Sequence, residues 1–161
     1  MIITRLNTRE DLERKRVDFQ KALAAQRKQI LICGGTGCVA GGSLKIYARM
    51  QELMNEWGVH CTLQLEEEAH DESIGIKKSG CHGFCEMGPL LRIEPMGWLY
   101  IKVKVEDCEE ILEQSILNDN VVDRLVYRDK DGKPYQKQEE IPFYKQQTRV
   151  ALEHCGHINA E

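Results

Sequence analysis

Four of the seven cysteines come as two close pairs. Cys33 and Cys38 enclose Gly-Gly-Thr-Gly, and Cys81 and Cys85 enclose His-Gly-Phe, with 42 residues between Cys38 and Cys81. Thiolate sulfur binds soft and borderline metals, and a cluster of two irons and two sulfides takes four thiolates, two at each iron. The spacing therefore predicts that Cys33, Cys38, Cys81 and Cys85 bind one 2Fe-2S cluster.

Glycine is concentrated around these pairs. Eight of the thirteen glycines lie in the two windows: Gly34, Gly35, Gly37, Gly41, Gly42, Gly80, Gly83 and Gly88. Glycine lets the backbone approach closely and adopt positive φ, so that amide N–H groups can point at negatively charged sulfur. Such hydrogen bonds offset the charge of a thiolate-bound cluster and help to set its reduction potential.

Three alternatives stay open for the same cysteines. Structural zinc also takes four thiolates, although usually in small metal-dependent domains, so the chain could be a zinc-stabilised protein-interaction module. A redox-sensing regulatory domain is a second alternative, but the C-x-x-C spacing of a thioredoxin-like dithiol is absent from the sequence. Four inert buried thiols are the third.

The other three cysteines are expected to have no part in the cluster. Cys61 lies in an alternating strand pattern and Cys108 on the apolar side of a helix, where free cysteine behaves as a small hydrophobe. Cys155 lies between His154 and His157, too few ligands for a closed tetrahedral site, and its role stays open. His82, between two proposed ligands, is expected to be an exposed loop histidine.

Composition limits the class of protein. A chain of 161 residues with 42% hydrophobic and 30% charged residues is typical of one soluble globular domain, with or without an appendage. No apolar run approaches the roughly 18 residues of a membrane helix and the first residues are charged, so we expect a cytoplasmic protein without direct membrane insertion. Residues 1–30 are basic but carry a single aromatic residue, Phe19, rather than the several that a single-strand binding surface interleaves with its basic residues, so we expect no nucleic-acid partner.

The sequence pattern predicts the elements that position the cysteines. The first helix is expected to be capped by the side chain of Asn7 or Thr8, with Leu12, Phe19 and Leu23 on one face. A second is expected to be capped by Ser43, to carry Ile46, Met50, Leu53 and Trp57 on one face and to stop at Gly58, and a third spans 105–117. Strands are expected at 29–33, 61–66 and 74–78, followed by a hairpin of 90–94 and 98–103.

This order of elements predicts an α/β fold of the thioredoxin type, with a mixed four- to five-stranded sheet and flanking helices. Both cysteine pairs follow predicted strands, so their loops can converge at one end of the sheet. Beyond residue 118 the apolar anchors become sparse, which predicts an extended C-terminal connector. The expected organisation is an N-terminal helical segment (1–28), a thioredoxin-like 2Fe-2S domain (29–118) and a connector (119–161).

The stretches ICGGTGCVAGGS and SGCHGFCEMGPLLRIEP, at this separation, resemble the thioredoxin-like 2Fe-2S ferredoxin domain. More narrowly, they resemble the version at the N-terminus of the flavoprotein (NADH-binding, or beta) subunit of NAD(P)-linked oxidoreductases, which include electron-bifurcating iron hydrogenases and enzymes similar to respiratory complex I. The tail IPFYKQQTRVALEHCGHINAE resembles the segment that leads into the flavin-binding domain of such subunits.

The resemblance implies an electron-transfer domain without a catalytic site of its own, in which Cys33, Cys38, Cys81 and Cys85 match the family's four ligands. Its partners would be other iron-sulfur and flavoprotein subunits of a multi-subunit oxidoreductase or hydrogenase. The Gly-rich flavin and NAD loops of those subunits do not occur in this sequence. FMN and NAD(P) are therefore expected only in a missing remainder or in a partner subunit.

Overall fold

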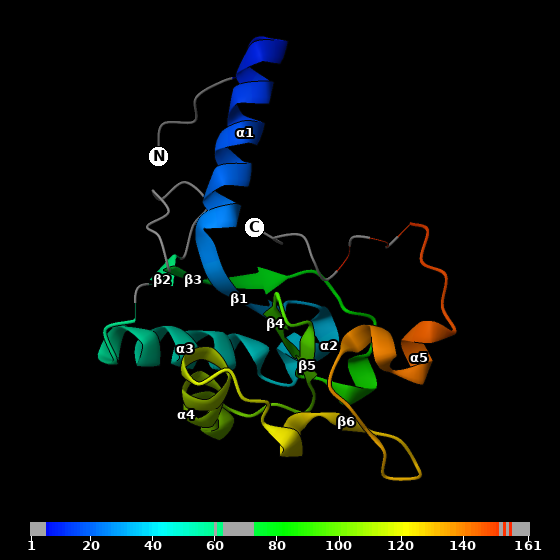
Figure 1. Ribbon diagram of the computed structural model, residues 1–161. Coiled ribbons are helices and arrows are strands. Elements are labelled where there is room, and N and C mark those ends of the chain that lie inside the picture. Colours follow the sequence, from blue (N-terminus) through cyan, green and yellow to red (C-terminus); the bar gives the residue numbers. More distant parts are fainter. Residues whose placement is uncertain (1–5, 60, 63–72, 152, 154, 156–161) are drawn as a thin grey trace.

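A five-stranded mixed sheet forms the centre of the molecule in the computed structural model, which describes residues 6–59, 61–62, 73–151, 153 and 155. For residues 19, 22–26, 61, 62 and 73 only the backbone is described. The strands are β1 (Gln26–Cys33), β2 (Cys61–Thr62), β3 (Ser73–Ser79), β4 (Leu91–Glu94) and β5 (Trp98–Tyr100). Their order is β2-β3-β1-β4-β5, which confirms the predicted mixed sheet with flanking helices (Figure 1).

The central strand β1 determines the layout. It pairs in parallel with β3 and antiparallel with β4, and both of its faces are covered, since Ile30, Leu31 and Ile32 are all buried. A strand buried on both faces is expected to be a continuous apolar run, as the sequence QILIC is. Cys33 stands opposite Ser79 in the parallel register, so the loops after β1 and β3 leave the sheet at the same edge.

One face of the sheet is covered by α3 (Ser43–Glu56) and by the helical segment that begins at Val105 (Figure 1). Two details of α3 differ from the prediction. Its N-cap is Gly42, at φ 97°, and Ser43 is the first helical residue, because only glycine takes this left-handed conformation readily. Trp57 is the C-cap and is 37% exposed, while Met54 is fully buried in its place.

The predicted third helix is a continuous helical segment with three hydrogen-bonding patterns. A 3₁₀ turn (Val105–Asp107) leads into α4 (Cys108–Ile111), and a π-helical stretch (Leu112–Leu117) follows. The start is capped by the Asp107 carboxylate, which accepts the Lys104 amide at 2.7 Å. At the end, the buried Lys28 side chain donates to the carbonyl oxygens of Ser115, at 2.9 Å, and Ile116.

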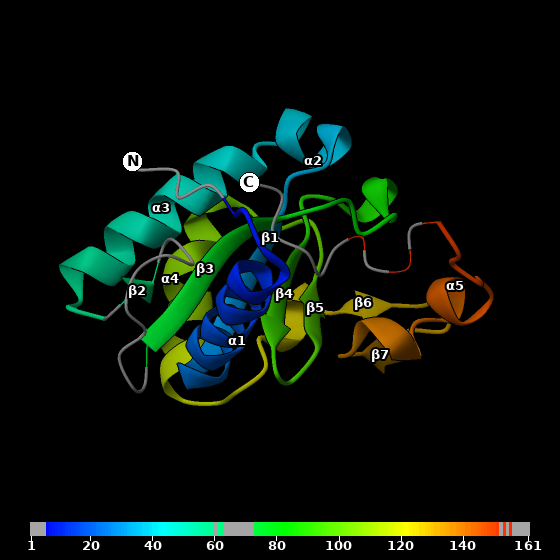
Figure 2. The ribbon, with the colours of Figure 1, turned by 90° about the horizontal axis from the view of Figure 1, so that it is seen from above.

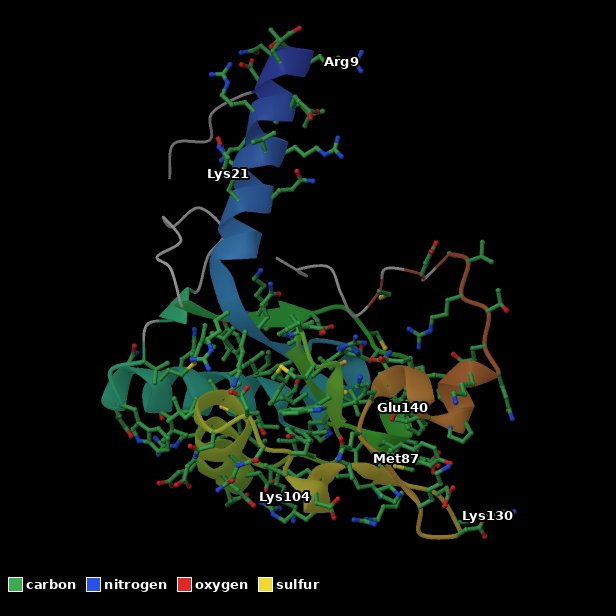
Figure 3. The ribbon with its side chains drawn as sticks, in the orientation of Figure 1. Arg9, Lys21, Met87, Lys104, Lys130 and Glu140 are labelled. Carbon is green, nitrogen blue, oxygen red and sulfur yellow. The ribbon has the colours of Figure 1, made fainter. Side chains whose placement is uncertain are left out.

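The N-terminal helix α1 (Arg9–Ala25) stands clear of the sheet (Figure 1). The Thr8 hydroxyl accepts the Asp11 amide at 3.1 Å, which confirms the predicted cap. Leu12 is 58% exposed, so the expected apolar face is in contact with solvent at this position. Figure 3 labels Arg9 and Lys21 on the same projecting helix. The side chains of Phe19 and Leu23 lie outside the described part.

The remaining elements match the prediction with shifted ends. Only β2 is described of the strand expected at 61–66, whereas β3 and β1 are longer than expected. The strand β5 stops at Tyr100, short of the expected 103, and the chain turns at Lys102, where φ is 49°. The Gly-rich stretch after Cys33 winds into a short helix, α2 (Thr36–Ala40), which the sequence did not predict. None of the helices in the described ranges is long and apolar enough to cross a membrane.

The residues expected to form an extended connector with few apolar anchors are packed against the sheet over much of their length. They form the hairpin β6 (Tyr127–Arg128) and β7 (Pro134–Tyr135), and then α5 (Pro142–Lys145), on the β5 side of the sheet (Figure 2). Buried Val122, Leu125, Val126 and Ile141 supply the anchors. The sequence pattern missed them because they are spaced irregularly rather than at a helical or strand period. The domain boundaries themselves stay a prediction.

Candidate metal centre

Backbone pairing brings the two cysteine loops together. Cys33 is the last residue of β1, and its amide donates to the Leu90 carbonyl at 3.0 Å. The next amide, of Gly34, donates to the carbonyl of Ser79, the last residue of β3, at 2.8 Å. The two loops therefore start from adjacent parallel strands and leave the sheet at the same end, as their expected convergence requires, and all four cysteines gather there.

The four thiols lie together as two pairs. The Sγ atoms of Cys81 and Cys85 are 3.9 Å apart, and the Cys33 thiol interacts with both Cys38 and Cys81. Among the described residues, no three His, Cys, Asp or Glu side chains are grouped as ligands of a single ion. Cys33 and Cys38 are buried, Cys81 is partly exposed and Cys85 is exposed. The first pair thus forms the inner side of the site and the second pair its outer side.

Glycines make this gathering possible. A Cβ atom on Gly35 would lie 3.1 Å from Cys81 Sγ, which is a tight contact, and one on Gly88 would lie 2.7 Å from Cys38 Sγ, closer than real Cβ contacts allow. Gly83 has φ 78° and its amide donates to Cys81 Sγ at 3.3 Å. Gly42 does not make room for a cysteine: it is the N-cap of α3, and nothing lies within 4 Å of the position that a Cβ atom would take there.

The two thiols of each pair are hydrogen-bonded to each other. The hydrogen bond from Cys38, aided by the amides of His82 and Gly35, lowers the pKa of the Cys33 thiol to about 6. The same bond raises the pKa of Cys38, which keeps its proton, and burial adds to this. The hydrogen bond with Cys81 raises the pKa of Cys85 in the same way. Metal binding must displace these protons, because thiolates are the ligand form.

His82 is buried rather than exposed, which corrects the sequence-based expectation. Its Nε2 lies 2.9 Å from Ser79 Oγ, and its Nδ1 lies 3.1 Å from Oε1 of Gln138. Gln138 is a buried glutamine in the part of the chain after residue 118, which we call the C-terminal segment. Sequence reasoning missed Gln138, because the polar run QKQEE around it carries no signal that one of its residues points inward.

An aromatic cluster covers the second cysteine loop. The Phe84 ring stacks on Phe143 with centroids 4.6 Å apart, and the rings of Tyr127 and Tyr144 contact it at 5.5 and 5.6 Å. Phe84 lies directly before Cys85, whereas its three partners all come from the segment after residue 118. The C-terminal segment therefore forms one wall of the candidate centre, on the side where Figure 3 labels Met87 and Glu140.

Of the remaining cysteines, Cys108 lies apart from the centre, in a different cluster of buried residues from Cys33 and Cys38. Cys108 is fully buried among the apolar residues under the sheet, and burial raises the pKa of its thiol to about 12, so the prediction of core packing is confirmed. The Cys61 side chain lies outside the description, as do His154 and His157. Cys155 is partly buried.

Comparisons with known proteins agree with this architecture. The family described as thioredoxin-like [2Fe-2S] ferredoxin matches residues 18–115. A 2Fe-2S ferredoxin of Clostridium pasteurianum is 36% identical over 62 residues, which are 38% of this chain and 61% of that protein. A 2Fe-2S ferredoxin of Aquifex aeolicus (strain VF5) is 41% identical over 59 residues, 37% of this chain and 51% of that protein. The chain thus spans about half to three fifths of these relatives.

A solved structure supports the fold. A crystal structure of a variant of the thioredoxin-like [2Fe-2S] ferredoxin from Aquifex aeolicus superposes with a TM-score of 0.50 at 24% identity, covering 63% of this chain and 99% of that one. The family match extends over more than half of the chain and includes both cysteine pairs. This protein therefore belongs to the thioredoxin-like 2Fe-2S ferredoxin family, the cofactor of which is a 2Fe-2S cluster.

Proposed function

We propose that Cys33, Cys38, Cys81 and Cys85 bind one 2Fe-2S cluster and that the protein carries single electrons. The observation that carries this proposal is the gathering of the four thiols, as two pairs, by loops that leave adjacent parallel strands. When bound, such a cluster supplies one-electron redox chemistry at a potential tuned by its surroundings.

The residues around the thiols fit this cofactor. Four thiolates leave an oxidised cluster with about two negative charges. Backbone amides are directed at the sulfur atoms to offset that charge: Gly83 donates to Cys81, and His82 and Gly35 donate to Cys33. The glycines keep the loops free of side chains that would occupy the same space. The chain's own part is thus to hold the ligands, supply N–H donors and limit the access of water.

The grouping of the thiols also bears on the alternatives. Zinc requires its four ligands around one ion, whereas a two-iron cluster takes two thiolates at each metal, and no three His, Cys, Asp or Glu side chains among the described residues are grouped as ligands of a single ion. A dithiol sensor would rely on one pair alone and would leave the second pair, with its glycines and amides, without a role.

Electron exchange is expected on the outer side of the centre. Cys33 and Cys38 are 1% exposed, while Cys85 is exposed and lies next to the exposed Glu86. A redox partner can therefore approach the second pair of ligands more closely than the first.

We further propose that the chain acts as the N-terminal domain of a flavin- and NAD(P)-dependent oxidoreductase or hydrogenase subunit, with FMN, NAD(P) and further iron-sulfur centres in the remainder or in partner subunits. This rests on the resemblance of the tail to the segment that leads into a flavin-binding domain. The family match also ends at residue 115, and the chain continues into a packed segment. Native purification tests it: a larger assembly with FMN is expected, and a free ferredoxin without flavin would contradict it.

Metal analysis tests the cluster. Protein purified anaerobically should contain about two irons and two sulfides per chain and give a reduced-state EPR signal. Cys81→Ser should lose or alter the cluster, while Cys108→Ser, a matched change outside the centre, should keep the iron content. A colourless protein with one zinc per chain would refute the proposal.

A further inference from the structure

We propose that Gln138 is a positioning residue of the metal centre: through His82 it holds the backbone between Cys81 and Cys85, and so raises the reduction potential of the cluster. The inference rests on the proposed cluster ligation. It assigns a role to the C-terminal segment, which lies beyond the family match.

The side chain of His82 is held from two sides. Gln138 lies at Nδ1 at 3.1 Å, and the Ser79 hydroxyl lies at Nε2 at 2.9 Å. His82 is completely buried and Gln138 is 7% exposed, so water does not compete for these bonds. The ring is thus fixed between the end of β3 and the C-terminal segment.

A second contact determines which way the amide of Gln138 points. Arg92 Nη1 lies 3.1 Å from Gln138 Oε1, and a guanidinium only donates hydrogen bonds, so the atom facing it must be the oxygen. Arg92 is itself paired with Glu94, with 2.7 Å between Nε and Oε1. The same Gln138 oxygen faces His82, and since an oxygen can only accept, Nδ1 carries the proton of this bond.

The backbone of His82 is held as well. The Tyr144 hydroxyl donates to the His82 carbonyl at 3.1 Å, and the Arg149 guanidinium donates to the same oxygen. The amide of His82 points to the Cys33 thiol. Gln138, Tyr144 and Arg149, all from the C-terminal segment, therefore hold His82 in place. The N–H of His82 in turn points to Cys33, which belongs to the first pair of ligands.

Gln138 is itself placed by the edge of the sheet. The backbone N–H of Gln138 donates to the Gly97 carbonyl at 3.3 Å, and the backbone carbonyl of Gln136 accepts the Leu99 N–H at 2.8 Å. Ile141, three residues later, is fully buried. The contact with His82 is therefore rigid, because the segment that delivers it is paired with β5.

The sign of the effect follows from charge. Reduction adds one negative charge to the centre, and an N–H aimed at sulfur stabilises the reduced form more than the oxidised form. If His82 is released, its amide is less well aligned with Cys33, and reduction becomes harder. A hydrogen bond to a charged group changes an equilibrium by about tenfold or more, so its weakening should lower the reduced-to-oxidised ratio by up to about tenfold, which is 59 mV for a one-electron couple.

Gln138→Leu tests the proposal, since leucine has a similar size but accepts no hydrogen bond. In the full chain, with two irons retained, the midpoint potential should fall and the reduced EPR signal should change its g-values. Gln136→Leu is the matched control: the same change, two residues away, at an exposed side chain. It should leave both quantities unchanged.

Tyr144→Phe tests the contact at the backbone carbonyl of His82. It is the deciding variant if Gln138→Leu does not fold. It removes only the hydroxyl that bonds to His82, so the potential should shift in the same direction. Tyr135→Phe is its control, because that hydroxyl bonds to Asp129 in the β6–β7 hairpin. Unchanged potentials in Gln138→Leu and Tyr144→Phe with two irons bound would overturn the role of Gln138. Fewer than two irons in the unaltered protein would instead refute the proposed cluster.

Discussion

Gly88→Ala should disrupt the metal centre while leaving the fold largely intact. A Cβ at position 88 would lie 2.7 Å from Cys38 Sγ and 3.2 Å from the Cys85 carbonyl oxygen. Ordinary contact begins at 3.4 Å, so Cys38 or Gly88 must move by 3.4 minus 2.7, or about 0.7 Å. Metal–ligand distances tolerate only about 0.2 Å. Gly88 has φ −73°, which alanine adopts freely, so the effect is steric and local.

We expect Gly88→Ala to lose most of its iron and sulfide per folded chain, whereas overpacking costs the fold only about 1–3 kcal/mol. Iron and sulfide analysis, visible absorption and thermal unfolding of the same sample measure the two effects separately. Gly132→Ala is the control: at φ 81° alanine is strained by about 1–2 kcal/mol, but nothing lies within 4 Å. The reasoning is refuted if Gly88→Ala keeps two irons per chain and an unaltered EPR spectrum.

Three further predictions concern the ligands and the core. Cys85→Ser should lose or alter the cluster although its thiol is exposed, whereas Cys108→Ala should keep two irons and lose stability through its cavity; equal iron loss in both would count against the assignment. Lys28→Met should lower the free energy of unfolding by about 1–3 kcal/mol in a denaturant titration, because two carbonyl oxygens lose their donor, while Lys21→Met on α1 should change it by less than about 0.5 kcal/mol. The hydrogen bond from Lys28 lowers the pKa of Asp119, so this ion pair stabilises the fold above about pH 4, and the contribution disappears as the pH falls through the lowered pKa. Asp119→Asn should remove that acid dependence, and an unchanged profile of the free energy of unfolding against pH would contradict the assignment.

The strands that carry the cysteines were predictable because their signals are local. QILIC is apolar at every position but the first, as a strand covered on both faces must be, and it ends at Cys33. The hairpin around Gly97 was predictable for a similar reason, since the loop needs a residue at positive φ, here 72°. The convergence of the two cysteine loops followed from these strands, and the parallel pairing of β1 with β3 confirms it.

The C-terminal segment was not predictable in the same way. Val122, Leu125, Val126 and Ile141 are buried, but no single period connects them, because they follow the irregular edge of the sheet rather than one face of a helix or strand. Leu12 shows the converse: a helical pattern predicts a face, but whether anything covers that face depends on where the helix points, and α1 projects away from the sheet.

The sequence alone was enough to predict a set of four thiolate ligands, because thiol spacing and nearby glycines are properties of short segments. It also determined the fold class, because strand and helix periods are local. Only the tertiary structure decided that His82 is buried, that Gln138 reaches it from 56 residues away and that Cys85 faces solvent while Cys33 does not. These features depend on which distant segments share an edge of the sheet, and burial and hydrogen bonding between distant residues are set only when the chain has packed.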